Sequence, residues 1–563
     1  MLQTGVGPSA ASAARTWMSL RSNGLQAAIR AAVFKSSDIL GYVAAMTQRI
    51  RFHRSLCLVV AAALSCAIPA TAQAQPATAN SAIEARIEAL VPDLEAYTSS
   101  AMKAFGVPGL AIGIVAGDRL VYAKGFGVRS KAGSAPVDAR TVFQVGSTTK
   151  AFLAATIGIM VDRKKFRWDD RVVDLYPEFQ LKDPWVTREF RVFDLLAQRS
   201  GLPPYVNDAL GFIGLDGAAT IRSLRYVEPV SSFRTTFAYT NITHVLAGDI
   251  VAKAAGAPDW NAVLRQELLD PLGMKESSYT AAAIAAASNH AVGYRWSPAG
   301  MSEVPFTQVF PYDYGGAGDL NSDVDDMARW VRLQLGDGSF EGRRIVSPES
   351  MAAARTPKVA VSDKAFYALG WIIQQTPNGN IVWHNGGTTG FGAYVGLLLD
   401  KGIGVIVLAN AVGFPDAIGM WTMDRILGNP DLDYAANTLK AVTTKHDAAA
   451  KMFAKPEHPR PFPPLTPLTG RFANPAIGEA SVTVEGDALV MEITATGAKL
   501  KLERWDGDVF TARLMPLGRF KTIAEDLGPL PAGFVQFQID KDAKLNVLRI
   551  SVEDGQAYEF VRE

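Results

Sequence analysis

The sequence is poor in cysteine and balanced in charge, and each of these absences excludes a class of protein. Only two cysteines occur among the 563 residues, Cys57 and Cys66, so the chain that follows them needs no disulfide to fold. The 56 basic and 55 acidic side chains give a net charge of +1. This balance lacks the basic excess of proteins that bind nucleic acid or anionic membranes, and we expect neither as a partner.

A metal or cofactor signature is also missing. The six histidines are His53, His244, His290, His384, His446 and His458. Their spacing resembles no zinc or iron site, and the sequence contains no Cys-x-x-Cys pair. We therefore expect neither a metal nor a cofactor.

The N-terminal region carries the pattern of a secretory signal peptide. Basic residues between 49 and 54 precede an apolar stretch at 56–68, which is too short to span a bilayer comfortably. Ala72-Gln73-Ala74 then fits the small-residue rule for cleavage. We expect the true start at Met46, cleavage near Ala74, and a secreted or periplasmic mature chain. Residues 1–74 are thus an upstream extension and a signal peptide.

Two alternatives remain for this N-terminal region: a lipoprotein attached at Cys66, or an uncleaved anchor. The longest later apolar run, at 394–410, is interrupted by Asp400 and Lys401. The sequence therefore predicts no integral membrane segment in the mature chain.

The pattern of elements predicts an α+β fold followed by a small all-β domain. Strand patterns at 110–115 and 120–124, and again at 369–373 and 380–384, enclose a mainly helical middle. This arrangement favours an antiparallel sheet flanked by helices, with an all-helical subdomain. The expected divisions are a first domain at 76–428, a helical and proline-rich linker at 429–467, and a β-barrel or sandwich at 468–563.

Ser147-Thr148-Thr149-Lys150 is the first candidate catalytic motif. If Ser147 opens a helix running to about residue 164, Lys150 lies one turn later on the same face. A serine hydroxyl is a weak nucleophile until a neighbour takes its proton, and a buried lysine with a lowered pKa can do this. The N-terminus of the helix would also stabilise an oxyanion. A second copy, Ser100 to Lys103, lies late in a predicted surface helix, where we expect a solvated face.

Two further motifs supply the other groups that such a reaction needs. Tyr239-Thr240-Asn241 offers a phenol for proton transfer and an amide to orient the lysine and the substrate. His384-Asn385-Gly386-Gly387 follows a predicted strand, whose edge can donate a second oxyanion N–H. A second copy of the tyrosine motif, Tyr205-Val206-Asn207, lies in a loop. Taken alone, the motif at Tyr239 also fits a half-buried tyrosine at the start of a helix. The motif at His384 alone also fits a glycine-rich turn.

The three motifs together, in this order, resemble the serine β-lactamase and penicillin-binding-protein superfamily. The resemblance is to the branch of class C β-lactamases, D-aminopeptidases and esterases. Similar stretches also occur at 195–203, 271–274 and 315–318. The resemblance covers about 85–428 and favours Ser147 and Tyr239 over their second copies.

The resemblance implies a role for each motif residue. Ser147 would be the nucleophile, and its N–H and that of Gly387 would form the oxyanion hole. Lys150 and Tyr239 would move the protons, and either can take the first one. Asn241, His384 and Gly386 would orient the substrate. The C-terminal β domain resembles one often appended to such enzymes.

One departure from the superfamily bears on the substrate. Classical β-lactamases carry Lys-Thr-Gly or Lys-Ser-Gly where this chain has His384-Asn385-Gly386, and a neutral histidine holds a substrate carboxylate less firmly than a lysine. The expected function is a serine hydrolase for amides or esters, a peptidase rather than an esterase, with small peptides, esters or β-lactam-like molecules as substrates. The alternatives are a weak β-lactamase or D-alanyl carboxypeptidase, or a protein that binds penicillin or cell-wall fragments without turnover.

Overall fold

The computed structural model describes residues 77–563, except 540, 542–543 and 553–555. The signal peptide, the start at Met46, the cleavage near Ala74 and the lipoprotein site at Cys66 all lie outside the described residues. Within them, no helix combines the length and the apolar character needed to cross a membrane.

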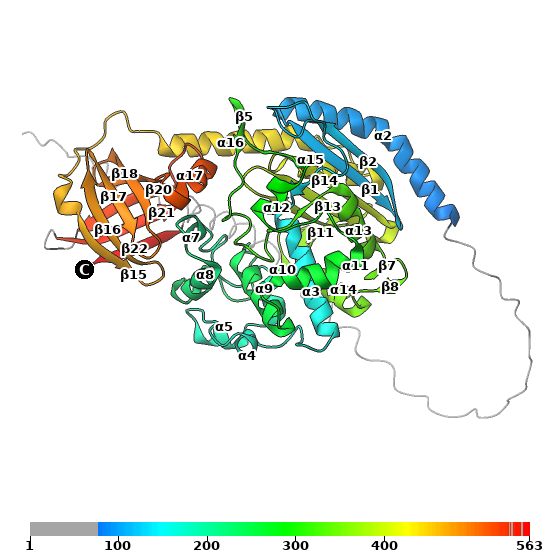
Figure 1. Ribbon diagram of the computed structural model, residues 1–563, viewed down its shortest axis with the longest axis horizontal. Coiled ribbons are helices and arrows are strands. Elements are labelled where there is room, and N and C mark those ends of the chain that lie inside the picture. Colours follow the sequence, from blue (N-terminus) through cyan, green and yellow to red (C-terminus); the bar gives the residue numbers. More distant parts are fainter. Residues whose placement is uncertain (1–76, 540, 542–543, 553–555) are drawn as a thin grey trace, which may run out of the picture. The chain divides into compact units, whose positions relative to one another are not determined.

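An eight-stranded antiparallel sheet is built from both ends of the first domain, as predicted (Figure 1). Its order is β2 (Arg119–Gly127), β1 (Gly109–Ala116), β14 (Ile403–Ala409), β13 (Gly392–Leu398), β12 (Gly379–Gly387), β11 (Ile372–Thr376), β10 (Ala365–Tyr367) and β9 (Val359–Ala360). Strand β1 pairs with β14 from Leu110–Ala409 to Ala116–Ile403. The strand predicted at 369–373 is wrong in its start, because β11 begins only at Ile372.

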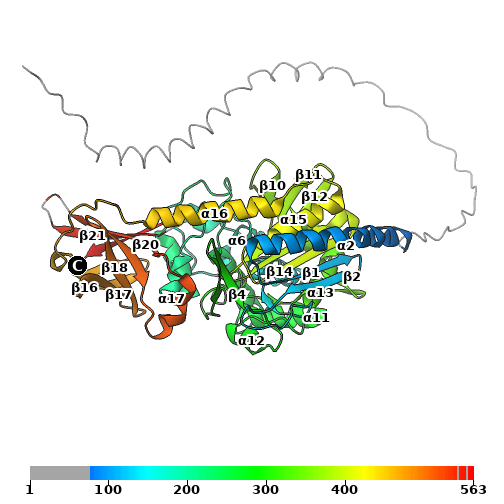
Figure 2. The same ribbon diagram turned by 90° about the horizontal axis from the view of Figure 1, so that it is seen from above.

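Helices cover both faces of this sheet (Figures 1 and 2). One face packs against α2 (Ala77–Phe105), α15 (Phe414–Leu427) and α16 (Tyr434–Phe453). The other face packs against α3 (Thr149–Asp162) and α13 (Val324–Leu335). Buried on both sides, β1 and β14 read as continuous apolar runs rather than alternating patterns.

Short helices form the predicted helical region between α3 and α13. They are α4 (Val172–Leu175), α5 (Pro184–Glu189), α6 (Val192–Leu196), α7 (Ala209–Phe212), α8 (Gly217–Ser223), α9 (Ile242–Ala255), α10 (Trp260–Leu264), α11 (Asp270–Leu272) and α12 (Ala281–Ala286). Helix α14 (Pro348–Arg355) follows α13. Short strand pairs are β3 (Phe143–Gln144) with β6 (Asn321–Ser322), β4 (Gly293–Ser297) with β5 (Gly300–Val304), and β7 (Ser339–Phe340) with β8 (Arg343–Arg344).

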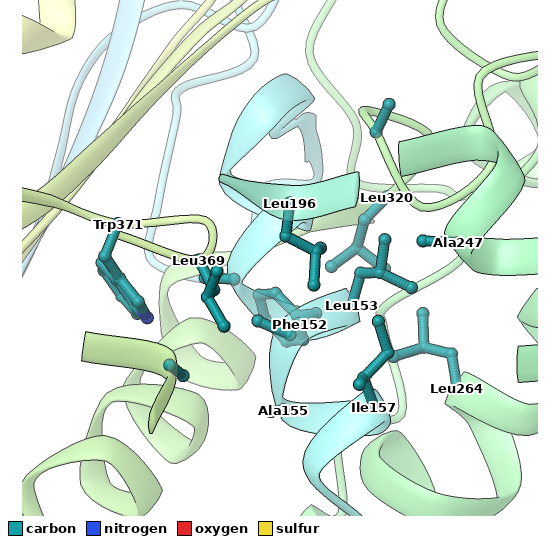
Figure 3. Packing of buried hydrophobic residues seen from close by; sticks show 14 of the residues in the cluster. Phe152, Leu153, Ala155, Ile157, Leu196, Ala247, Leu264, Leu320, Leu369 and Trp371 are labelled. Carbon is teal, nitrogen blue, oxygen red and sulfur yellow. The ribbon is translucent and has the colours of Figure 1, made fainter. Parts of the chain in front are cut away.

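Helix α3 runs through the centre of the domain and is apolar on nearly all sides. Its residues from Thr149 to Met160 are all buried, which is typical of a helix enclosed in a core. Figure 3 shows Phe152 beside Leu196 of α6 and Leu369, with Leu153 facing Leu320. Because α3 is packed on nearly all sides, the position of its first turn, which carries Lys150, is determined by the core.

The C-terminal domain is a closed eight-stranded barrel rather than a sandwich. Its strands are β15 (Gly470–Asn474), β16 (Gly478–Glu485), β17 (Ala488–Ile493), β18 (Ala498–Asp506), β19 (Val509–Leu514), β20 (Gly533–Ile539), β21 (Leu545–Val552) and β22 (Ala557–Arg562). A short helix, α17 (Lys521–Leu527), connects β19 to β20. Pairing of β15 with β22 closes the barrel, so no sheet edge is left open.

The barrel and the first domain belong to one structural unit and share an apolar cluster. Leu210 and Leu215, at either end of the α7 region, are buried with the barrel side chains. Gln556, before β22, accepts a hydrogen bond from the Asn207 N–H at 2.9 Å and donates one to the Tyr205 carbonyl at 3.0 Å. Helix α16 also packs on α15 and α2, so the segment expected as a linker is partly a packed helix.

Candidate active site

Ser147 lies in a single 3-10 turn, Gly146–Thr148, immediately before α3. The prediction that Ser147 opens the α-helix is therefore wrong by two residues, because α3 begins at Thr149. Gly146 has a φ of +51°, which favours glycine, and a Cβ there would sit 2.7 Å from the Gly387 nitrogen. The turn thus presents the half-buried Ser147 beside the end of β12.

Lys150 is fully buried in the first turn of α3, and its ammonium nitrogen has three polar neighbours. Nζ lies 3.0 Å from Ser147 Oγ, 2.7 Å from Asn241 Oδ1 and 2.8 Å from the Ala317 carbonyl oxygen. Burial lowers the pKa of Lys150 to about 7, against the opposing effect of the Asp208 and Asp319 carboxyls. A substantial fraction of the amine is therefore neutral near neutral pH.

The three neighbours of Lys150 suit an ammonium that donates to all three, and they also suit a neutral amine whose lone pair faces the serine. A neutral amine has two N–H groups and one lone pair. The Asn241 and Ala317 oxygens can only accept, so they take the two N–H groups, and the lone pair is left for the Ser147 hydroxyl. Asn241 is held in this orientation because its Nδ2 donates to Asp208 Oδ2 at 2.6 Å.

Tyr239 lies just before α9, with its hydroxyl hydrogen-bonded to Ser147. Desolvation raises the pKa of this phenol well above its ordinary value, so it stays protonated near neutral pH. Lys150 Nζ is 4.7 Å from the ring centroid. Gln198 fixes the backbone of the motif, because its side chain accepts from the Thr240 N–H at 2.6 Å and donates to the Thr240 carbonyl at 3.1 Å.

The glycines of the third motif allow β12 to lie directly against the serine turn. A Cβ on Gly386 would overlap the carbonyl oxygen of Val145 and lie 3.1 Å from the Ser147 nitrogen. Only glycine therefore permits this approach. The approach brings the Gly387 nitrogen beside the Ser147 turn, where two backbone N–H groups can face one oxyanion.

His384 is buried and uncharged beneath the site. Its Nδ1 donates to the Asn385 carbonyl at 2.5 Å, so Nε2 accepts from the Tyr367 hydroxyl at 3.0 Å. Burial, together with the charge of Lys150, lowers the pKa of His384 to about 3. The histidine therefore offers no fixed positive charge where classical β-lactamases carry a lysine.

The residues around Ser147 lie within a region that matches a known protein family. The family described as Beta-lactamase matches residues 94–428, which is more than half of the chain and contains all three motifs. The chain belongs to the β-lactamase family. A second match, to a domain of unknown function named DUF3471, spans residues 454–561 and covers the barrel.

Proteins similar to this β-lactamase-family chain are named as hydrolases and penicillin-binding proteins. The unguisins hydrolase ungD of Aspergillus violaceofuscus is 26% identical over 491 residues, covering 78% of this chain and 86% of that protein. Penicillin-binding protein 4 of Amycolatopsis lactamdurans is 26% identical over 387 residues, covering 65% and 93%. The octameric penicillin-binding protein homologue from Pyrococcus abyssi has a TM-score of 0.55 at 24% identity, covering 84% of this chain and all of that one.

The relatives support a serine hydrolase in general terms. The solved structure shows the shared fold, and the relatives named as hydrolases show the general class of reaction. Within the described residues, no group of histidines, cysteines and carboxylates could hold a metal ion.

The structure brings all seven predicted site residues of this β-lactamase-family chain together. Around a cavity of about 460 Å³ lie Ser147, Tyr239, Asn241, His384 and Gly387. Gly386 packs against Val145 beside the Ser147 nitrogen, and Lys150 Nζ reaches Ser147 Oγ. The remaining lining residues are Tyr205, Asp208, Phe212, Phe237, Phe310, Tyr314, Ala317, Gly318, Tyr367, Ile372 and Asn385.

Four residues of the site were not predicted from the sequence. Asp208 orients Asn241, and Tyr367 donates to His384. Asp319 accepts from Trp260 at 2.9 Å and from the Gly316 N–H at 3.2 Å, which holds the loop whose Ala317 carbonyl faces Lys150. The glycines at 315–318 were a signal for this loop, although not for its carboxylate.

The fourth residue is Tyr205, which lines the same cavity. It belongs to the second copy of the tyrosine motif, and its ring lies beside that of Tyr239, with the centroids 5.6 Å apart and the planes tilted by 44°. The Tyr205 N–H also donates to the Tyr239 carbonyl at 2.6 Å. The proline-containing loop that carries Tyr205 therefore forms one wall of the candidate-site cavity.

Proposed function

We propose that this protein cleaves amide or ester bonds through an acyl-enzyme on Ser147, and that it is a peptidase rather than an esterase. The observation that carries the proposal is the set of neighbours around Lys150 Nζ, with two acceptors and the Ser147 hydroxyl at 3.0 Å. This arrangement suits a neutral amine that accepts the serine proton.

Acylation would proceed in balanced proton and bond changes. Lys150 takes the hydroxyl proton of Ser147 while Oγ forms a bond to the substrate carbonyl carbon. The negative charge that develops on the carbonyl oxygen is held by the N–H groups of Ser147 and Gly387. The bond to the leaving amine or alcohol then breaks, and Ser147 carries the acyl group.

Tyr239 would complete the proton transfer. Its protonated phenol touches Ser147 and lies above Lys150. It can give its proton to the leaving group and regain one from the Lys150 ammonium. A water molecule then attacks the ester by the reverse sequence, which releases the acid and restores Ser147.

The neutral His384 favours substrates without a carboxylate beside the scissile bond. A buried imidazole that already donates to the Asn385 carbonyl has no charge to offer such a group. A weak β-lactamase or D-alanyl carboxypeptidase, or a binder without turnover, is the second candidate, favoured by the relative named penicillin-binding protein 4.

Intact mass after mixing with an activated ester tests the acyl-enzyme. We expect a mass increase with steady product release, and its loss in Ser147→Ala. Ser100→Ala is the matched control, because Ser100 heads the exposed second copy of the motif. Equal labelling of wild type and Ser147→Ala would remove Ser147 as nucleophile. A stable adduct without product would favour the binder. A screen of D- and L-peptides, simple esters and a chromogenic cephalosporin then separates the substrate classes.

A further inference from the structure

A second cavity, larger than the catalytic one, lies where the mouth of the barrel meets the first domain. Its volume is about 660 Å³, within the range of pockets that hold a small molecule. Closed barrels of eight strands are wide enough to hold one small ligand. No step of the proposed reaction uses this cavity.

The wall of this barrel-mouth cavity is apolar on both sides. The barrel contributes Ile493, Leu500, Leu514, Ile550 and Phe560, one from each of five strands. The first domain contributes Phe105, Phe212, Trp296, Met301 and Val412. A cavity with such a lining favours an apolar occupant over water.

Some apolar side chains around the cavity remain open to solvent. Val412 is 44% exposed and Leu530 is 40% exposed, although both line the cavity. Helix α16 closes one side with Val442 and Ala449, and Ala449 is only 8% exposed. Covering this surface with an aliphatic chain would remove it from water, at a gain proportional to the area buried.

The charged side chains that line the cavity have one sign. Among the described residues that line it, Arg295, Lys445 and His446 are basic or titratable, and none is an aspartate or glutamate. Two carboxylates stand nearby outside the lining. Arg295 donates to the backbone carbonyl of Asp526, and His446 lies 3.3 Å from Asp447. A ligand with an anionic end is therefore complementary to this rim.

We propose that the barrel-mouth cavity binds an aliphatic carboxylate, with its chain among the barrel side chains and its carboxylate near Arg295 and Lys445. This goes beyond the proposed function and does not depend on which bond Ser147 breaks. The cavity is next to the catalytic one, because Phe212 lines both. A bound chain would therefore touch a residue that also forms the substrate wall.

The test measures binding to the full chain carrying Ser147→Ala, so that turnover cannot contribute. Isothermal titration with hexanoate, octanoate, decanoate and dodecanoate is compared with the alcohols of equal length. We expect affinity to rise about fourfold for each added methylene until the cavity is filled. The carboxylates should bind more tightly than the alcohols. Affinity that does not depend on chain length would overturn the proposal.

Two variants of α16 locate the site. Ala449→Phe fills the cavity and should weaken dodecanoate binding about tenfold, the equivalent of one to two methylenes. Ala450→Phe, on the exposed side of the same helix, is the matched control and should bind like the parent.

If Ala449→Phe does not fold, Lys445→Glu replaces it, since Lys445 is exposed. It should weaken the carboxylates but leave the alcohols unchanged. If Ala449→Phe and Ala450→Phe bound dodecanoate with equal affinity, the ligand would not bind in this cavity. If Lys445→Glu weakened acids and alcohols equally, the carboxylate would not lie near Lys445.

Discussion

The lowered pKa of Lys150 makes the stability of the protein depend on pH. In the unfolded chain this amine has its ordinary pKa of 10.5, and in the folded protein burial lowers it to about 7. Between these two values the unfolded state binds a proton that the folded state has lost. The free energy of unfolding therefore rises with pH in this window, by about 1.4 kcal/mol per pH unit at most.

Comparison with Lys150→Met isolates this effect, because methionine fills similar space without a titratable group. From pH 6 to pH 9 the folded lysine goes from mostly charged to almost wholly neutral. The wild type should then gain about 3 kcal/mol of stability relative to the variant. Below the folded pKa both states hold the proton, and the difference should become constant. Urea unfolding followed by circular dichroism at several pH values measures it.

The matched control is Lys103→Met, since Lys103 is exposed at the end of the second Ser-x-x-Lys copy. Its stability should follow the wild type at every pH. If wild type and Lys150→Met keep a constant difference from pH 6 to pH 9, Lys150 remains charged and cannot take the serine proton. The rate of acylation by an activated ester should rise through the same folded pKa and level off above it.

Three further substitutions test the proton carrier, the oxyanion hole and the contact between the barrel and the first domain. Tyr239→Phe should lower the rate of ester or peptide turnover by about 10²–10⁴-fold while the melting temperature changes little, because only a proton carrier is lost. Gly386→Ala should lower kcat by about 10²-fold or more, since its Cβ overlaps Val145 and displaces the second oxyanion donor. Gln556→Ala should lower kcat/KM about fivefold, because the barrel then releases the loop at Asn207 that carries one wall of the catalytic cavity.

Each of these changes has a control that leaves the site intact. Tyr226→Phe alters an exposed tyrosine, and Gly133→Ala adds a methyl where no atom lies within 4 Å. Gln536→Ala removes a bond to Asp508 that lies wholly within the barrel. If Tyr239→Phe kept full activity, Tyr239 would not be the group that carries the proton to the leaving group. Unchanged kcat in Gly386→Ala would remove Gly387 from the oxyanion hole, and unchanged kcat/KM in Gln556→Ala would separate the barrel from catalysis.

The sequence was sufficient for those features that repeat a local pattern. Apolar runs marked β1 and β14, and the glycine pair at Gly386 and Gly387 marked a close approach of backbones. Short strands separated by turns predicted a small all-β domain, but they left open whether it is a barrel or a sandwich, and the closure of β15 on β22 is visible only in the structure. A pattern of this kind depends only on neighbouring residues, so it can be read without the fold.

The remaining features depend on contacts between distant residues. Asp208 and Tyr367 have no motif of their own, and each matters only because the fold places it beside Asn241 or His384. The first residue of a helix also differed between the prediction and the structure. Helix α3, for example, begins at Thr149 and not at Ser147, because a 3-10 turn precedes it.

The pairing of β1 with β14 joins residues about three hundred positions apart, and this has a consequence for biosynthesis. Ser147 leaves the ribosome long before Gly387, yet the serine turn gains its second backbone donor only when β12 lies against it. A growing chain therefore carries Ser147, the proposed nucleophile, without the neighbouring strand β12 until most of the domain has been made. Contacts of such separation form slowly, so the candidate site can be complete only after the chain up to Gly387 has left the ribosome.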